Sequence, residues 1–192
     1  LNNFVTMVNN IGESSIVING KGIKSYNQYW NKKMSKLRSI AKTVNDLNWT
    51  KQMQILTDKR YFKMEYFMHC ASKCIVDYCM KHNIGTIIIG KNDKWKQNSE
   101  MNKVTNQNFV YIPYETFINK LEYKCESVGI NLIKTEESYT SGTSFLDNEL
   151  PIKENYNKSR RIKRGLFKSN SGKYINADVN GAFQIMRKVF SN

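Results

Sequence analysis

Acidic residues are scarce in this sequence of 192 residues, which has sixteen Asp and Glu against thirty Lys and Arg. The resulting net charge of +14 favours a polyanionic partner, and nucleic acid is the commonest polyanion. A basic protein without such a partner is the alternative that composition alone leaves open. Hydrophobic residues make up 40% of the chain, so it can bury a sizeable core.

Long apolar runs are also lacking. No stretch approaches the roughly 18 residues of a membrane span, and no signal peptide is present. A disulfide framework is not expected either, because Cys70, Cys74 and Cys79 share one predicted helix. Their spacing also matches no usual arrangement of zinc ligands. Leu1 stands where a methionine would begin a complete chain, so we expect a fragment of a longer protein.

What the sequence does contain is an alternation of strand and helix patterns. The predicted elements are strands at 4–8 and 14–20, helices at 23–47 and 59–82, a strand at 85–91, a helix at 112–129 and a strand at 130–136. This order predicts a mixed α/β sheet with parallel pairs covered by helices. The strand 85–91 is expected to be buried on both faces. Sites in such folds gather at the carboxyl ends of parallel strands, here residues 90–92 and 135–137.

Residues 138–164 interrupt this pattern, because they are polar and short of large apolar side chains. Within and just after them lies a basic run that contains one acid, Glu154, and two aromatic residues, Tyr156 and Phe167. Its basic residues are Lys153, Lys158, Arg160, Arg161, Lys163, Arg164 and Lys168. Phosphate contacts and base stacking would explain this composition, and a solvated loop is the alternative.

Asp178 lies where a predicted hairpin, with its turn at Ser169–Gly172, meets a helix whose apolar stripe runs from Val179 to Phe190. Aspartate is a favoured N-cap, and its carboxylate also suits a hard metal ion, so the local sequence leaves both roles open. Glu136 and Glu137 follow a predicted strand. They are either solvated or metal ligands.

Four separated blocks of the sequence point to a known family. The blocks are GTIIIGKNDKWKQ, NQNFVYIPYETFINKLEYKCESVGINLIKTEESYTS, SFLDNE and RRIKRGLFKSNSGKYINADVNGAFQIMRKV. Together they resemble the C-terminal half of the OrfB/TnpB proteins, which insertion sequences encode and which are related to the type V CRISPR effector nucleases. The opening LNNFVTMVNN resembles the continuation of that family's first nuclease motif.

The resemblance implies an RNase H-like domain of the RuvC type, with a mixed sheet flanked by helices. Its core would be residues 1–137 and 165–192, and residues 138–164 would be a basic insertion in the place of the family's zinc ribbon. It further implies an RNA-guided DNA endonuclease that uses Mg²⁺ or Mn²⁺, with DNA and guide RNA as partners. We expect such a protein in the prokaryotic cytoplasm, associated with the nucleoid.

The resemblance also suggests site residues. Asp178 matches the aspartate of the last nuclease motif. Gly90 stands in the place of the middle glutamate, so Glu136 or Glu137 is expected to replace it, and we favour Glu136. Asp178 and Glu136 would bind Mg²⁺, while the basic run and Lys96, next to Trp95, would contact nucleic acid.

Two departures qualify these expectations. The family's first aspartate would precede Leu1, and no cysteine follows Cys125, so no zinc is expected. Two carboxylate positions do not hold two metal ions, so we expect the chain alone to be inactive. The alternatives are a nuclease-inactive relative that binds nucleic acid as a repressor, and a decayed fragment.

Overall fold

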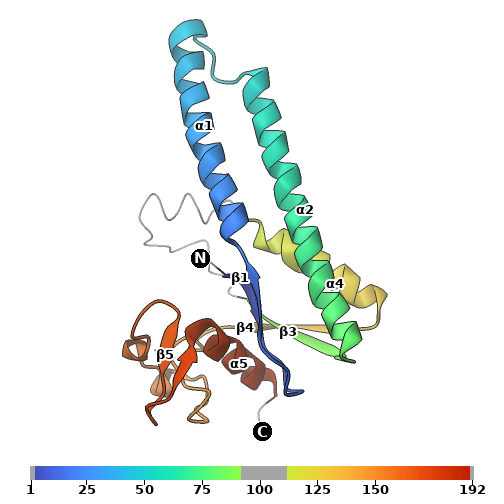
Figure 1. Cartoon of the computed structure of the whole chain (residues 1–192), viewed down its shortest axis with the longest axis vertical. Helices are drawn as coiled ribbons and strands as arrows, with labels where there is room; N and C mark the ends of the chain where they lie inside the picture. The colour runs from blue at the N-terminus through green and yellow to red at the C-terminus, as the bar shows by residue number, and fades with distance from the viewer. Residues whose placement is uncertain (1–2, 92–111, 191–192) are drawn as a thin grey trace. The chain divides into compact units, whose positions relative to one another are not determined.

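The computed structural model describes residues 3–91 and 112–190, which fold as two compact units (Figure 1). The helical unit takes in residues 19–84 and 112–129, and the mixed unit takes in residues 3–18, 85–91 and 130–190. Among these residues, no helix is both long enough and apolar enough to cross a bilayer.

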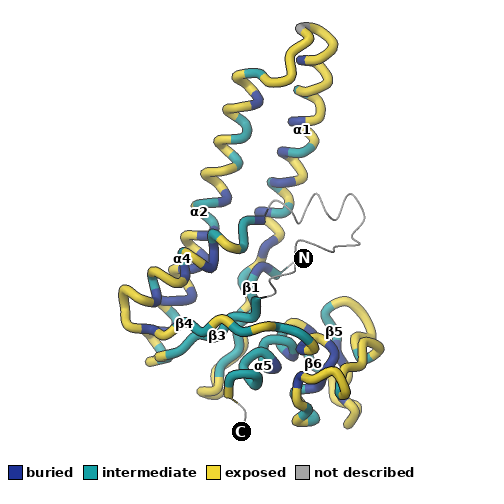
Figure 2. The backbone as a smooth tube through the Cα atoms, turned by 180° about the vertical axis from the view of Figure 1, so that it is seen from behind, coloured by how far each residue is buried: buried dark blue, intermediate teal, exposed yellow. Residues whose placement is uncertain are grey.

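The helical unit consists of α1 (Lys21–Asn45), α2 (Lys51–Lys81) and α4 (Tyr114–Ser127). After α1 the chain turns at Asp46, which adopts the left-handed conformation with φ of 51°. Trp30, Met34 and Ala41 of α1 form a buried cluster with Met53 of α2. Buried positions recur along both helices in Figure 2, as the predicted stripes require.

The helix α2 begins at Lys51, whereas the apolar stripe predicted a start at residue 59. Thr50 explains the earlier start, because its side-chain oxygen accepts a hydrogen bond from the Met53 backbone N–H at 3.3 Å and caps the helix. The helix predicted at 112–129 is confirmed as α4, which spans Tyr114–Ser127. Its buried residues are Phe117, Ile118, Leu121 and Cys125.

The mixed unit is built from short strands and a helix. The elements are β1 (Asn3–Met7), β2 (Ile16–Asn19), β3 (Thr86–Lys91), β4 (Asn131–Glu136), β5 (Leu166–Lys168), β6 (Tyr174–Asn176) and α5 (Ala177–Val189). Within the described residues the strands pair as three two-stranded sheets, β1–β2, β3–β4 and β5–β6, and not as the one sheet predicted. The parallel pairing of β3 with β4 is confirmed.

The pair β3–β4 brings the two predicted site edges together. Gly90 lies opposite Thr135, and Lys91 lies opposite Glu136. Every residue of β3 is half-buried, so the prediction of a strand buried on both faces is wrong. The physical reason is that each strand of a two-stranded sheet is an edge strand. The helix α5 packs against both strands (Figure 1).

Between β4 and β5 the chain is irregular, with short 3₁₀ turns η1 (Lys153–Asn155) and η2 (Lys158–Arg160). The predicted hairpin that follows is confirmed, since β5 and β6 pair antiparallel. Its turn is closed by the backbone N–H of Ser169, which donates to the Lys173 carbonyl at 2.8 Å. Gly172 has φ of 81°, a conformation that glycine adopts at little cost.

The most deeply buried face of α5 is polar. Ala177, Asn180 and Gln184 are buried, whereas the predicted stripe from Val179 to Phe190 is half-buried or exposed. The prediction of an apolar buried face is therefore wrong. Asn180 and Gln184 face irregular backbone, whose buried N–H and C=O groups need hydrogen-bond partners.

The cluster around Met53 predicts a stability difference between two methionines of α2. Met53 is fully buried, and Met80 is 54% exposed. Replacing Met53 by alanine should lower the free energy of unfolding by about 2–5 kcal/mol, because it leaves a cavity between α1 and α2. Met80→Ala is the matched control and should change it by less than about 0.5 kcal/mol. Urea denaturation followed by circular dichroism measures both, and equal losses would contradict the packing described.

Candidate functional site

Asp178 is the second residue of α5 and connects segments that are far apart in the sequence. Its Oδ2 accepts a hydrogen bond from Asn3 Nδ2, at the start of β1, at 2.9 Å. Its Oδ1 lies 3.8 Å from the Arg161 guanidinium. The Asp178 side chain is 43% exposed, so the carboxylate can still reach an ion or solvent.

The N-cap of α5 is Asn176 and not Asp178. Asn176 Oδ1 accepts hydrogen bonds from the backbone N–H groups of Asp178 at 2.9 Å and Val179 at 3.2 Å. The capping role left open for Asp178 is therefore wrong, since a cap must precede the first helical residue. The carboxylate still lies in the first turn of α5, near the positive end of the helix dipole.

Glu136 ends β4 and is engaged by its neighbours. Its Oε1 accepts hydrogen bonds from the hydroxyl and the backbone N–H of Ser138, the latter at 2.8 Å, and its Oε2 accepts one from Lys188 Nζ at 3.1 Å. These bonds, that of the Ser138 hydroxyl first, lower the pKa of Glu136. A solvent-exposed carboxylate is thus already paired with a cation of α5.

Glu137 has a different environment from its neighbour. Burial first, and the charge of Glu136 second, raise the pKa of Glu137. Among the described residues, its carboxylate has neither a hydrogen-bond nor an ion-pair partner. Adjacent carboxylates whose pKa values are pushed apart can take different roles, and the unpaired one is available to a ligand.

Gly90, at the carboxyl end of β3, lies against both Glu137 and α5. A Cβ on Gly90 would come within 2.6 Å of Ile185 Cδ1 and 3.1 Å of Glu137 Cβ. No side chain fits at this position without displacing Ile185. A glutamate at this position, to which the resemblance assigns one, would therefore require Ile185 to move, and Glu137 lies next to it.

The face of α5 that carries Asp178 is open at Gly181. Asp178 and Ile185 lie on one face of the helix, two turns and about 10 Å apart along its axis. Gly181 lies between them on that face, and a Cβ there would meet no described atom within 4 Å. Lys188, the partner of Glu136, is about 15 Å from Asp178 by the same measure. Glu137 thus lies with Ile185 around Gly90, whereas Glu136 is paired with Lys188, three residues further along α5.

The oxygen donors at this face are of the kind that Mg²⁺ prefers. Their number is small, because the described residues nowhere bring together three His, Cys, Asp or Glu side chains that could hold a metal ion. Asp178 and Glu137 therefore fit such an ion in chemistry and need a further ligand from outside the described residues.

The basic run lies mostly in solvent. Its exposed members are Lys153, Lys158, Arg161, Lys163, Arg164 and Lys168. Arg160 differs, because its side chain is only 14% exposed and forms an ion pair with Glu149. Arg161 connects the run with Asp178. Lys96 and Trp95 lie outside the described residues.

The two aromatic residues of the run have different roles. Phe167 is fully buried, so the expectation that it stacks on a base is wrong, and it belongs to the core of the hairpin. Tyr156 is 38% exposed and packs edge-on against Tyr139, with ring centroids 5.8 Å apart. Its ring also covers Gly142, where a Cβ would come within 2.5 Å.

The polar side chains of α5 that bind the irregular segment were not predicted from the sequence. Asn180 Nδ2 donates to the Thr143 carbonyl at 2.8 Å. Gln184 Nε2 and Arg187 Nη1 donate to the Glu149 carbonyl at 3.1 Å and 2.9 Å. The available signal was their spacing of four and three residues, which places polar groups on one helix face.

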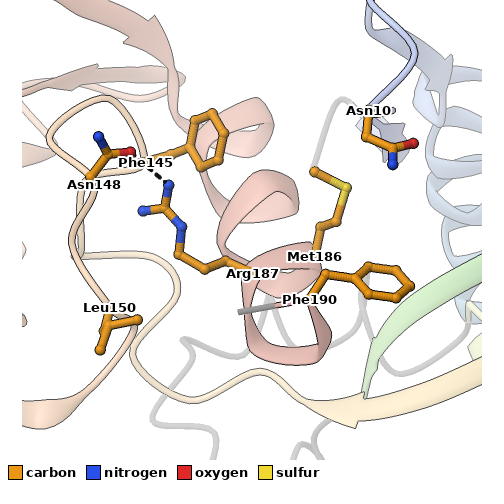
Figure 3. A pocket seen from close by; sticks show the side chains of 7 residues that line it. All are labelled: Asn10, Phe145, Asn148, Leu150, Met186, Arg187 and Phe190. Carbon is orange, nitrogen blue, oxygen red and sulfur yellow. Dashed lines mark hydrogen bonds between the residues drawn. The ribbon is translucent and has the colours of Figure 1, made fainter. Parts of the chain in front are cut away.

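A groove of about 610 Å³ lies near the C-terminal end of α5 (Figure 3). Arg187 lies over the ring of Phe145, 4.6 Å from its centroid, and donates to Asn148 Oδ1 at 3.0 Å. Met186 and Phe190 complete its apolar side. The lining contains no carboxylate, so this groove is distinct from the face that carries Asp178.

Two family profiles match the chain. The profile OrfB_IS605, described as "Probable transposase", matches residues 1–96, and the profile "Cas12f1-like, TNB domain" matches residues 114–185. No curated protein matches the chain.

Two solved structures are similar to the chain. One is titled "Cryo-EM structure of the Cas12f1-sgRNA-target DNA complex", with a TM-score of 0.70 and 24% identity over 98% of this chain and 48% of that chain. The other is titled "Cryo-EM structure of CRISPR-Cas12f Ternary Complex", with a TM-score of 0.68 and 23% identity over 94% of this chain and 36% of that chain. The small sheets and helices described above are thus a fold shared with Cas12f structures, of which the chain spans about half or less.

The tight contact at Gly90 predicts a substitution with a specific rescue. Gly90→Ala should lower the free energy of unfolding by about 1–3 kcal/mol, because the new methyl group meets Ile185. Ile185→Val removes Cδ1, so the double variant should recover part of this loss. Gly85→Ala is the control, since a Cβ there has no described neighbour within 4 Å. Thermal unfolding that shows the same change for Gly85→Ala as for Gly90→Ala would contradict the contact.

Proposed function

Since the chain belongs to the transposase family OrfB_IS605, we propose that it is the nuclease half of a transposon-encoded, RNA-guided DNA endonuclease. The mixed unit is then an RNase H-like core of the RuvC type, in which residues 138–164 are an insertion. The observation that carries the proposal is the position of Asp178. It lies near the start of α5, hydrogen-bonded to Asn3 of β1, with open space at Gly181 on the same helix face, and Ile185 further along that face lies with Glu137 around Gly90.

In this proposal the acids that bind Mg²⁺ are Asp178 and Glu137, with an aspartate from the preceding part of the chain. Glu137 is preferred over Glu136 because its carboxylate is unpaired among the described residues and lies beside Gly90. Glu136 is engaged by Ser138 and Lys188 and would have to release both to bind a metal ion.

A bound divalent ion would activate a water molecule and neutralise the charge that develops on the phosphate oxygens. The residues of the chain prepare for this. Asn3 holds Oδ2 of Asp178 and leaves Oδ1 directed toward Arg161. Arg161 is exposed and pairs loosely, so a phosphate can replace Asp178 as its partner while the ion neutralises the freed carboxylate.

The exposed members of the basic run contact the DNA backbone in this proposal. Lys158, Arg161, Lys163 and Arg164 lie in the same irregular segment, and Arg161 places that segment beside Asp178. Positive charges close to the acids offset the repulsion between carboxylates and DNA phosphates.

The guide RNA has a separate surface in the helical unit. The helix α1 carries seven Lys and Arg residues and no acid. Lys33 and Lys36 line a groove of about 270 Å³ together with Tyr29, whose side chain is 47% exposed. Lys33 and Lys36 are three residues apart, about 4.5 Å along the helix axis, so they lie on the same face of α1. The charge and the exposed ring suit an RNA strand.

A nuclease-inactive binder is the second candidate function. It is favoured by the absence, among the described residues, of three clustered metal ligands, and by the pairing of Glu136 with Lys188. The same acid substitutions distinguish the two candidates, because a binder has no cleavage to lose.

In the full-length protein with its guide, Asp178→Ala and Glu137→Gln should each reduce Mg²⁺-dependent DNA cleavage by at least about a hundredfold. Nucleic-acid affinity should stay within a few-fold, because neither acid contributes to phosphate binding. Glu136→Gln is the matched control and should retain most of the cleavage. Cleavage of a labelled plasmid measures the nuclease activity, and filter binding measures the nucleic-acid affinity.

Undiminished cleavage by Asp178→Ala would refute the proposed centre. Loss of cleavage by Glu136→Gln with retention by Glu137→Gln would reverse the assignment of the two glutamates. No cleavage by the unsubstituted protein over a range of Mg²⁺ and Mn²⁺ concentrations would favour the binder.

Replacing Arg161, Lys163 and Arg164 together by glutamine should weaken DNA binding and flatten its dependence on salt. Each lost phosphate contact lowers the slope of log K against log salt by about 0.9. Lys59, Lys73 and Lys81 are exposed on α2 of the helical unit, and their triple replacement removes the same charge from outside the basic run. Equal slopes for the two triple variants would mean that the basic run does not contact phosphate.

A further inference from the structure

The segment between β4 and β5 stands where the resemblance predicts a zinc ribbon, but its residues do not fit zinc. Structural zinc sites use thiolate and imidazole ligands. From residue 126 to residue 192 the sequence contains neither cysteine nor histidine. The segment nevertheless folds tightly, and Gly142, Thr143 and Ser144 within it are buried. Something other than zinc must therefore connect its distant parts.

Glu149 is the point at which these parts meet. Its Oε2 accepts a hydrogen bond from the backbone N–H of Ser144 at 2.8 Å and also binds the guanidinium of Arg160. Its Oε1 accepts a hydrogen bond from Asn170 Nδ2 at 2.8 Å. The side chain of Glu149 is only 15% exposed, and that of Arg160 14%, so water screens this pair little. One carboxylate thus connects the start of the segment, the turn η2 and the hairpin β5–β6.

The backbone carbonyl of Glu149 extends the same connection to α5. It accepts hydrogen bonds from Gln184 Nε2 at 3.1 Å and Arg187 Nη1 at 2.9 Å. The carbonyl of Thr143, the residue before Ser144, accepts a hydrogen bond from Asn180 Nδ2 of the same helix. The segment is therefore hydrogen-bonded to the helix that carries Asp178 in its first turn.

Asp147 makes a second set of bonds to the hairpin. Its carboxylate accepts hydrogen bonds from the backbone N–H groups of Asn170 at 2.6 Å and Ser171 at 3.2 Å. Burial raises the pKa of Asp147, but hydrogen bonds from Ser144, Asn170 and Ser171 outweigh it and lower the pKa to about 2. The carboxylate is therefore ionised throughout the neutral range and binds the turn at Ser169–Gly172.

We propose that Glu149, with Arg160 and Asp147, takes the place of a zinc ion as the structural centre of this segment. A tetrahedral zinc site joins four ligands from two distant turns. Glu149 likewise joins Ser144, Arg160 and Asn170 through its carboxylate and α5 through its carbonyl. Glu149 is then a positioning residue, because fixing Arg160 also fixes the adjacent Arg161 beside Asp178. The expected effect of Glu149 on nucleic-acid binding rests on the proposed function, whereas its expected effect on folding stability does not.

The first test uses the 192-residue chain and needs no activity. Glu149→Gln leaves the buried Arg160 guanidinium without its counter-charge and should lower the midpoint of thermal unfolding by about 5–10 °C. Glu154→Gln is the matched control, because Glu154 is exposed in η1, and it should change the midpoint by less than about 2 °C. The double variant Glu149→Gln, Arg160→Gln should recover part of the loss, because it removes both charges.

If Glu149→Gln does not fold, the variant Arg160→Lys is tested instead. It should lower the unfolding midpoint by less, because lysine keeps the charge of arginine but not its forked geometry. Zinc content by mass spectrometry should be far below one ion per chain. A zinc chelator such as TPEN should leave the unfolding midpoint unchanged. Stoichiometric zinc, a chelator-sensitive midpoint, or equal effects of Glu149→Gln and Glu154→Gln would overturn the inference.

The second readout separates this inference from the proposed function. Glu149→Gln, measured below its unfolding midpoint, should flatten the salt dependence of DNA binding, because Arg161 and its neighbours are no longer held in place. A lower midpoint together with an unchanged salt slope would keep Glu149 as the structural centre and reject the nucleic-acid role of the basic run. An unchanged midpoint would reject the structural role whatever the binding shows.

Discussion

The hydrogen bonds from the polar face of α5 to the backbone of residues 143–149 hold the mixed unit together. An irregular segment carries buried N–H and C=O groups that no sheet or helix satisfies, and each would cost free energy if left unpaired. Asn180 satisfies the Thr143 carbonyl and the Phe145 N–H, and Gln184 and Arg187 satisfy the Glu149 carbonyl. Because Asp178 lies in the first turn of the same helix, the bonds that fold the segment also help to place Arg161 beside that acid.

Charge explains why this arrangement is stable in so basic a protein. Asp147, Glu149 and Asp178 each pair with donors or cations of the mixed unit. Glu137 differs from these acids, because burial first and the charge of Glu136 second raise its pKa, and the attraction of Lys188 does not outweigh them. An uncompensated carboxylate costs stability, and acids of this kind are frequent at functional sites.

Much of the fold could be predicted from the sequence, and the site could be predicted only in part. The helices and the final hairpin follow from periodicity and from turn residues, which act over a few positions. The start of α2 was misplaced because Thr50 caps the helix before its apolar stripe begins. Asp178 was identified as a candidate, but its capping role was wrong, because Asn176 two residues earlier takes it. Arg160 is indistinguishable from Arg161 in sequence, although only one of them is paired with Glu149.

The sequence by itself determined the basic character of the chain, its helices and hairpin, the lack of zinc ligands after Cys125 and the identity of the candidate acids. These properties depend on composition and on neighbours within about one or two helical turns. Only the tertiary structure decided that Gly90 has no room for a side chain, that Glu137 rather than Glu136 is unpaired, and that Glu149 joins three distant segments. Such contacts join residues far apart in the chain, and their energies depend on burial, which a linear pattern of residue types does not specify.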